Sequence, residues 1–166
     1  MRPNLPDPAS APELFDGVLT RRVVAFLIDS VIMTAMTAAI SIVGVVAGFL
    51  TFGLAWVALP FVIVFVLLAY YAMTLGSHGR ATIGMAAMDL VLTPTRGAPL
   101  DGWRILIHPL IFWITVWIAW PFSLLIALLT PRREMVQDLV TGTLMLRRSP
   151  MQRHWQGHAH GAGTQA

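Results

Sequence analysis

The chain has 166 residues, of which 57% are hydrophobic and 11% charged, and its mean hydropathy is +0.73. Soluble domains carry about 25% charged residues, so this composition excludes an ordinary water-soluble domain and indicates one membrane domain. The chain has no cysteine, which excludes disulfides, thiolate metal sites and cysteine nucleophiles. The formal net charge is +3 and every basic residue is arginine, a balance typical of cytoplasmic flanks beside anionic lipid rather than of nucleic-acid binding.

The two ends of the chain differ from the predicted membrane domain, which we place at residues 21–148. Residues 1–20 contain four prolines, three acidic residues and one arginine, which predicts a disordered lead and does not match a signal peptide. Residues 149–166 are predicted to be a disordered tail. Because no further ligand pattern accompanies the histidines of this tail, we expect no metal and no cofactor. These histidines are His154, His158 and His160.

Residues 23–75 contain a single charged residue. About 20 apolar residues cross a bilayer, so this stretch predicts two transmembrane helices, at about 22–48 and 54–75. Tyr70 and Tyr71 fall near the end of the second helix, where interfacial aromatic residues are expected.

Small and hydroxyl side chains recur along one face of the first predicted helix. They are three or four residues apart, a spacing that keeps them on one side of a helix. Such a stripe lets another backbone approach closely, so we predict a helix-packing face, and the alternative is the lining of a polar path. The stripe consists of Ser30, Thr34, Thr37, Ser41, Gly44 and Gly48.

The single charged residue of residues 23–75 is Asp29, which lies about 10 Å of helix rise beyond Arg22. A carboxylate inside a bilayer costs about 2.5–3.5 kcal/mol and needs a partner, water or a proton. Arg22 lies on nearly the same face but prefers to reach outward to phosphate, so an arginine from another segment is a second candidate partner. A functional carboxylate and a structural ion pair both remain open.

Residues 76–102 form a polar loop that is too long for a simple turn. Within it, residues 87–92 predict a short strand, and residues 143–148 predict a second one. Each strand otherwise lacks a neighbour, so we expect the two to pair. The glycine-containing run 79–84 does not match a phosphate-binding loop, because no strand precedes it and the Gly-Lys-Ser/Thr ending is missing.

Residues 105–130 form a third apolar segment, expected as a helix at about 103–131 and interrupted at Trp120-Pro121. The segment is too short for two crossings of about 20 residues each. A single crossing would leave five of the eleven arginines outside, against the positive-inside rule. A re-entrant hairpin bent near Trp120-Pro121 avoids this, so we predict that both termini and the central loop are cytoplasmic. A plain third span is the alternative.

Three short motifs together resemble the RDD family of bacterial membrane proteins. The motifs are Arg21-Arg22-Val-Val-Ala-Phe-Leu-Ile-Asp29, residues 79–92 and Gln137-Asp138-Leu-Val-Thr-Gly142-Thr143. The family is named for an arginine at the start of its first membrane helix, an aspartate within that helix and a later aspartate. The matching positions are Arg22, Asp29 and Asp138, and the supporting positions are Thr82, Gly84, Gly142 and Thr143. Arg104 is a further supporting candidate outside these motifs.

Two positions depart from the family pattern, and at both of them this chain lacks a basic or imidazole side chain that is usual in the family. Met85 stands where a basic residue is usual, and Gln137 stands where histidine is frequent. The resemblance covers about residues 15–148 and implies a membrane protein with suggested transport, sodium–proton exchange being reported for some members.

Two functions follow as hypotheses. In the first, the chain transports an ion or small solute, Asp29 binds the proton or cation, and Arg22 and Asp138 set the field at the cytoplasmic mouth. In the second, the chain is a non-catalytic membrane scaffold or accessory subunit that binds partner helices through the stripe, and the three charged residues fix one packing. We do not expect an enzyme, because no catalytic motif such as GxSxG or HExxH is present.

The expected fold is an all-α membrane protein with two transmembrane helices, a third broken apolar segment that is re-entrant or spanning, and a small cytoplasmic strand pair. The expected location is the bacterial cytoplasmic (inner) membrane, with the N-terminus inside because two arginines precede the first span. The expected partners are the lipid bilayer and either further copies of the chain or other membrane proteins, with no nucleic acid. The transported ion or solute, if there is one, is not named by the sequence.

Overall fold

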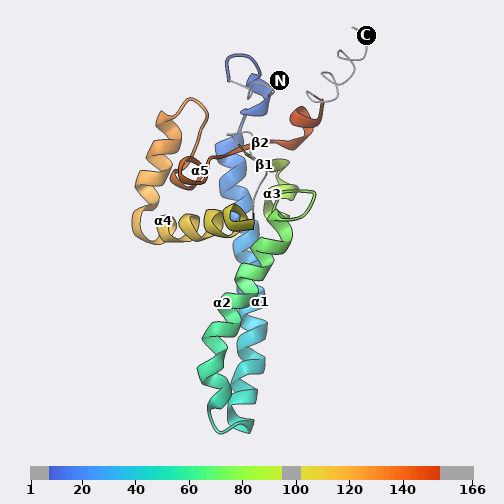
Figure 1. The fold of residues 1–166 in the computed structure, drawn as a ribbon, viewed down its shortest axis with the longest axis vertical. Coiled ribbons are helices and arrows are strands. Elements are labelled where there is room, and N and C mark those ends of the chain that lie inside the picture. The colour runs from blue at the N-terminus through green and yellow to red at the C-terminus, as the bar shows by residue number, and fades with distance from the viewer. Residues whose placement is uncertain (1–7, 95–101, 154–166) are drawn as a thin grey trace.

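A long two-helix hairpin projects from a wider head in the computed structural model (Figure 1), which describes residues 8–94 and 102–153. The described elements are η1 (Pro12–Leu14), α1 (Val18–Leu50), α2 (Leu54–Leu75), α3 (Ile83–Ala87), β1 (Leu90–Pro94), α4 (Gly102–Leu129), α5 (Val136–Thr141) and β2 (Thr143–Arg147). The head holds η1, the start of α1, the end of α2 and all later elements, while the hairpin consists of the rest of α1 and α2.

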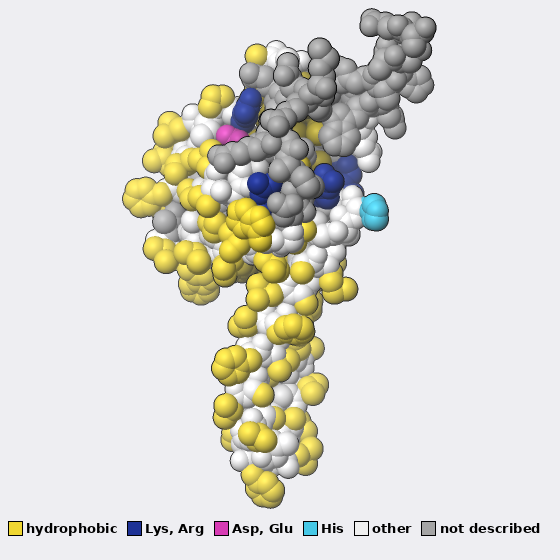
Figure 2. Space-filling model, viewed as in Figure 1, with side chains coloured by type: hydrophobic (Ala, Val, Ile, Leu, Met, Phe, Trp, Pro, Cys, Tyr) yellow, Lys and Arg dark blue, Asp and Glu magenta, His cyan; other side chains and the backbone are white. Residues whose placement is uncertain are grey.

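The hairpin formed by α1 and α2 carries a lipid-compatible surface. Residues 30–75 contain no charged side chain, and Figure 2 shows arginine, acidic and histidine side chains over the head and none on the visible face of the hairpin. Large apolar side chains point outward along it, including Ile42, Phe49, Phe61 and Phe65. Both helices are long and apolar enough to cross a membrane, so the two predicted transmembrane helices are confirmed.

The lower part of the predicted stripe is a helix-packing face. Gly44 faces the side chain of Leu59, and Gly48 lies against the indole of Trp56, so that a methyl group at either glycine would collide with α2. Higher on α1, Ser30, Thr34 and Thr37 line a cavity among α1, α2 and α4. The stripe therefore packs on α2 at its glycine end and faces a cavity at its hydroxyl end.

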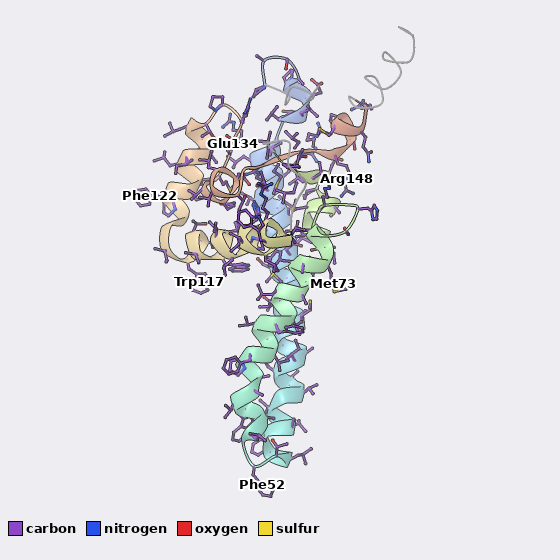
Figure 3. The ribbon with its side chains drawn as sticks, viewed as in Figure 1. Phe52, Met73, Trp117, Phe122, Glu134 and Arg148 are labelled. Carbon is purple, nitrogen blue, oxygen red and sulfur yellow. The ribbon has the colours of Figure 1, made fainter. Side chains whose placement is uncertain are left out.

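Helix α4 is broken near the predicted position. Its parts Gly102–Ile118 and Pro121–Leu129 are bent by 113° relative to each other. Proline lacks an amide hydrogen and its ring clashes with the preceding turn, which explains a break next to Pro121. The first part crosses beside α1 and α2, and the second turns away from the hairpin tip that Phe52 marks (Figures 1 and 3).

The two short strands pair as expected. Strands β1 and β2 are antiparallel, with Leu90 opposite Arg147 and Pro94 opposite Thr143. The first strand begins at residue 90 and not at residue 87, because residues 83–87 form the short helix α3. The Thr82 hydroxyl caps this helix by accepting from the amide of Met85 at 3.1 Å.

The structure differs from the expected disordered ends. Within residues 8–20, Leu14 is completely buried and Ala11 and Phe15 are nearly so. They cover the apolar side of β2 together with Met151, so parts of both the predicted lead and the predicted tail are ordered. The proline-rich composition predicted that the entropy cost of ordering this segment would keep it disordered. Burial of apolar side chains in this second, smaller core offsets that cost. The tail histidines lie outside the described residues.

Candidate functional site: two buried carboxylate clusters

The carboxylate of Asp29 joins three helices. Asp29 is 7% exposed, and its Oδ1 accepts hydrogen bonds from the Tyr70 hydroxyl at 2.7 Å and from the Gly84 amide at 2.8 Å. Its Oδ2 accepts from the Thr82 hydroxyl at 2.5 Å. The donors come from α2, α3 and the residue before α3, so this carboxylate fixes both elements to α1. Hydrogen bonds to an ionised acceptor are roughly twice as strong as neutral ones.

Glycine at position 84 makes this arrangement sterically possible. A Cβ atom there would come within 2.9 Å of the Asp29 carboxyl carbon and would collide with the backbone oxygen of Ala25. The absence of a side chain lets the amide of Gly84 reach Oδ1 directly. Thr82 and Gly84, two of the supporting positions of the family resemblance, thus both donate to Asp29.

The second cluster is a buried ion pair between α1 and α5. Nη1 of Arg22 donates to Oδ2 of Asp138 at 2.5 Å, and the two side chains are 4% and 0% exposed. The same Oδ2 accepts from the Met135 amide at 3.0 Å at the start of α5. Asp138 therefore closes the first turn of α5 and attaches this helix to α1. Removing one partner of such a pair costs about 3–5 kcal/mol, because the other charge is left buried.

His108 connects α4 to this second cluster. Its Nδ1 lies 3.2 Å from the hydroxyls of both Thr141 and Thr143, and its Nε2 lies 3.8 Å from Oδ1 of Asp138. Gly142, between the two threonines, takes a left-handed conformation with φ of 63° and ends α5. This turn brings the hydroxyls of Thr141 and Thr143 within hydrogen-bond distance of the His108 imidazole.

Both clusters border one cavity. The cavity has a volume of about 440 Å³ and is lined by residues of α1, α4, α5 and β2 together with the end of α2. The ionisable and hydrogen-bonding residues that line it include Arg22, Asp29, Thr82, His108 and Gln137.

The two candidate partners of Asp29 were Arg22 and an arginine from another segment. Arg22 does not pair with Asp29 but with Asp138, 116 residues further along the chain. Two helical turns of separation keep the side chains of Arg22 and Asp29 apart, whereas the fold brings α5 directly to Arg22. The three family positions thus form two clusters and not one network. Arg104 lies in α4 with its guanidinium 5.6 Å from the Trp103 ring centre.

Two participants were not identified from the sequence. Tyr70 was expected in an interfacial belt, but its hydroxyl points inward to Asp29. His108 was treated only as part of the third apolar segment, although a histidine buried in an apolar helix needs polar partners and could have been singled out.

Asp29 lies about one bilayer thickness from the tip of the hairpin. From Asp29 to the end of α1 at Leu50 there are 21 residues, 50 minus 29, or about 32 Å of rise. The hydrocarbon core is about 30 Å thick. If the hairpin tip lies at one surface, Asp29 lies at the other, level with Tyr70 near the end of α2. At that depth the cost of the charge would be lower than at the bilayer centre, because this cost falls toward the interface.

The fold and the two clusters define a small helical membrane protein with two candidate spans and a head fixed by buried carboxylates. The sequence profile of the RDD family matches residues 17–142, and the chain belongs to this family. Comparisons with curated proteins and with solved structures gave no match.

Proposed function

We propose that this RDD family protein is a non-catalytic accessory or scaffold protein of the bacterial inner membrane, with its head in the cytoplasm. The observation that supports this most is the environment of Asp29, whose two oxygens already accept three hydrogen bonds from protein donors. A carrier carboxylate must exchange its ligands, whereas this one is held by three elements. The ion pair of Arg22 and Asp138 is also a structural contact, because Asp138 caps α5 at the same time.

The shape of the hairpin supports the same proposal. Along its lower part the described structure has α1 and α2 alone, and the two helices are in contact at Gly44 and Gly48. Two helices in contact enclose no water-filled path. The glycines of the stripe are covered by α2, so partner helices would bind instead to the exposed apolar faces that carry Ile42, Phe49 and Phe61.

Transport remains the second candidate, and one observation favours it. Arg22, Asp29 and His108 border the same cavity, and ionisable groups within membrane proteins often mark ion pathways. A complete path would then require further copies of the chain around the hairpin.

A proteoliposome flux assay separates the two functions. We expect no sodium- or proton-coupled flux that depends on Asp29, so wild type and Asp29→Asn should give equal traces. Flux in the wild type that Asp29→Asn abolishes, while the variant still inserts and stays folded, would establish transport and contradict our proposal.

A double-variant cycle tests the fixing role itself. Asp29→Asn and Thr82→Val each remove part of one hydrogen-bonded cluster, so the loss of thermal stability in the double variant should be smaller than the sum of the two single losses. Additive losses would show that the two side chains act independently.

A further inference from the structure

The cavity beside the two clusters has the size and lining of a small-molecule site. Its volume of about 440 Å³ falls within the range of about 300–1,000 Å³ that is usual for ligand pockets. Most of its walls are apolar and come from α1, α2, α4 and β2. They include Phe26, Leu75, Phe112, Val116, Leu124 and Met145.

Two buried polar side chains on these walls have hydrogen-bonding atoms without a partner in the described structure. They are Nε and Nη2 of Arg22, whose Nη1 pairs with Asp138, and Oε1 of Gln137. Arg22 is 6% exposed and Gln137 is 3% exposed, and both line the cavity. A buried polar group without a partner costs about 1–3 kcal/mol, so these atoms indicate a missing occupant.

The atoms without a partner indicate which hydrogen-bonding groups the polar head group of that occupant carries. The Nε and Nη2 edge of a guanidinium presents two parallel N–H groups, which suit an acceptor oxygen such as a carbonyl. Oε1 of Gln137 needs a donor, which a hydroxyl supplies. The head group of the ligand therefore combines a hydrogen-bond acceptor with a hydrogen-bond donor.

The charges around the cavity favour a ligand with a neutral head group. The positive charge of Arg22 is already balanced by Asp138, and Asp29 adds a second carboxylate to the walls. His108 also lines the cavity. An anionic head would place a third negative charge near one arginine in a poorly solvated space, where repulsion is strong.

We propose that this cavity binds a neutral single-chain amphiphile of the bilayer, of the monoacylglycerol type. Its ester carbonyl accepts from Arg22, a glycerol hydroxyl donates to Gln137, and its acyl chain lies against Phe26 of α1 and against Phe112 and Val116 of α4. Ordered water alone is the competing occupant, because water also satisfies buried polar groups.

Native mass spectrometry of the full-length protein in a non-ionic detergent tests this site. We expect one molecule of monooleoylglycerol to be retained per chain. Gln137→Leu removes the acceptor for the hydroxyl while keeping the size of the side chain, so it should weaken this binding about 3- to 10-fold, the equivalent of one hydrogen bond. Methyl oleate has the carbonyl and no hydroxyl, so its affinity should be the same for wild type and Gln137→Leu.

A second pair of variants tests whether the ligand lies in the cavity. Val116→Trp fills the space with an indole and should abolish retention of monooleoylglycerol. Ile114 is 49% exposed and does not line the cavity, so Ile114→Trp should preserve retention. Equal retention by both tryptophan variants would place the lipid on the outer surface and overturn the proposal. No retention by wild type would leave water as the occupant and overturn it too. If Val116→Trp does not fold, the comparison of the two ligands on Gln137→Leu decides alone, and equal weakening of both ligands contradicts the proposal.

Discussion

At the residue scale, the effect of a substitution at Asp29 depends on which of its hydrogen-bond donors can also act as acceptors. The hydroxyls of Tyr70 and Thr82 can rotate and accept, whereas the Gly84 amide can only donate. Asparagine keeps one oxygen for Gly84, so Asp29→Asn should lower the unfolding free energy by about 1 kcal/mol, while Asp29→Ala should lower it by about 3 kcal/mol. Thermal unfolding in detergent measures both. Equal losses for the two variants would show that the charge, and not the number of hydrogen bonds, matters.

Gly84 provides a second residue-scale prediction, because its neighbours leave no room for a methyl group. Gly84→Ala should separate α3 from α1 and lower the unfolding free energy by about 2–3 kcal/mol, since the backbone oxygen of Ala25 cannot move independently of α1. Gly102→Ala is the matched control, because nothing lies within 4 Å of a Cβ at that position. If both variants unfold at the same temperature, the contact between Gly84 and α1 is not tight.

At the scale of elements, the packing of α1 on α2 depends on the two glycines of the stripe. Gly44→Leu and Gly48→Leu introduce side chains where Leu59 and Trp56 already lie, whereas Val45 is 46% exposed and tolerates Val45→Leu. We expect both glycine variants to weaken the hairpin, measured as a lower unfolding temperature in detergent, and Val45→Leu to have little effect. Negligible effects at all three positions would mean that the stripe faces lipid.

The junction between β1 and β2 should make the stability of the head depend on pH. Burial alone would raise the pKa of Asp89, but two hydrogen bonds from Ser149 and the charges of Arg147 and Arg21 outweigh this effect and lower it. A carboxyl group whose pKa is lowered by folding stabilises the fold above its unfolded pKa, about 3.9, and loses this contribution as the pH falls through the folded value. Asp89→Asn should therefore unfold at a lower temperature than wild type at pH 7, and the difference should shrink as the pH falls from 7 to below about 4. A constant difference over this range would contradict the assignment to Asp89.

The helices were predictable from sequence because bilayer length and hydropathy act locally along the chain. Helix α2 has the predicted bounds, and α4 breaks where Pro121 removes a donor. Helix α3 was missed because its position depends on Asp29, 53 residues away from its capping residue Thr82. The pairing of Arg22 with Asp138 was missed for the same reason, since nothing in either segment specifies which distant charge the fold will bring near.

At the scale of the whole molecule, the polar head lies at one end of the hairpin. Helices α3 and α5, both strands and the described arginines gather there, while the turn at Phe52 forms the opposite end (Figures 1 and 2). Since both parts of α4 lie on the head side of that turn, the chain leaves α4 at the end where it entered α1. This arrangement is compatible with the predicted re-entrant segment, for which the positive-inside rule predicts a cytoplasmic head.

Cysteine labelling of intact cells tests this orientation, because the natural chain has no cysteine. Gln152 is exposed and follows β2, and it is a better labelling position than Ser149, whose amide and hydroxyl donate to Asp89. We expect a membrane-impermeant maleimide to leave Gln152→Cys unmodified until the cells are lysed. Phe52→Cys is the control on the opposite side, at a fully exposed position of the hairpin turn, and it should be modified in intact cells. Modification of Gln152→Cys without lysis would mean that α4 crosses the membrane, because the segment after it would then lie outside while the two arginines before Val23 hold the start of α1 inside.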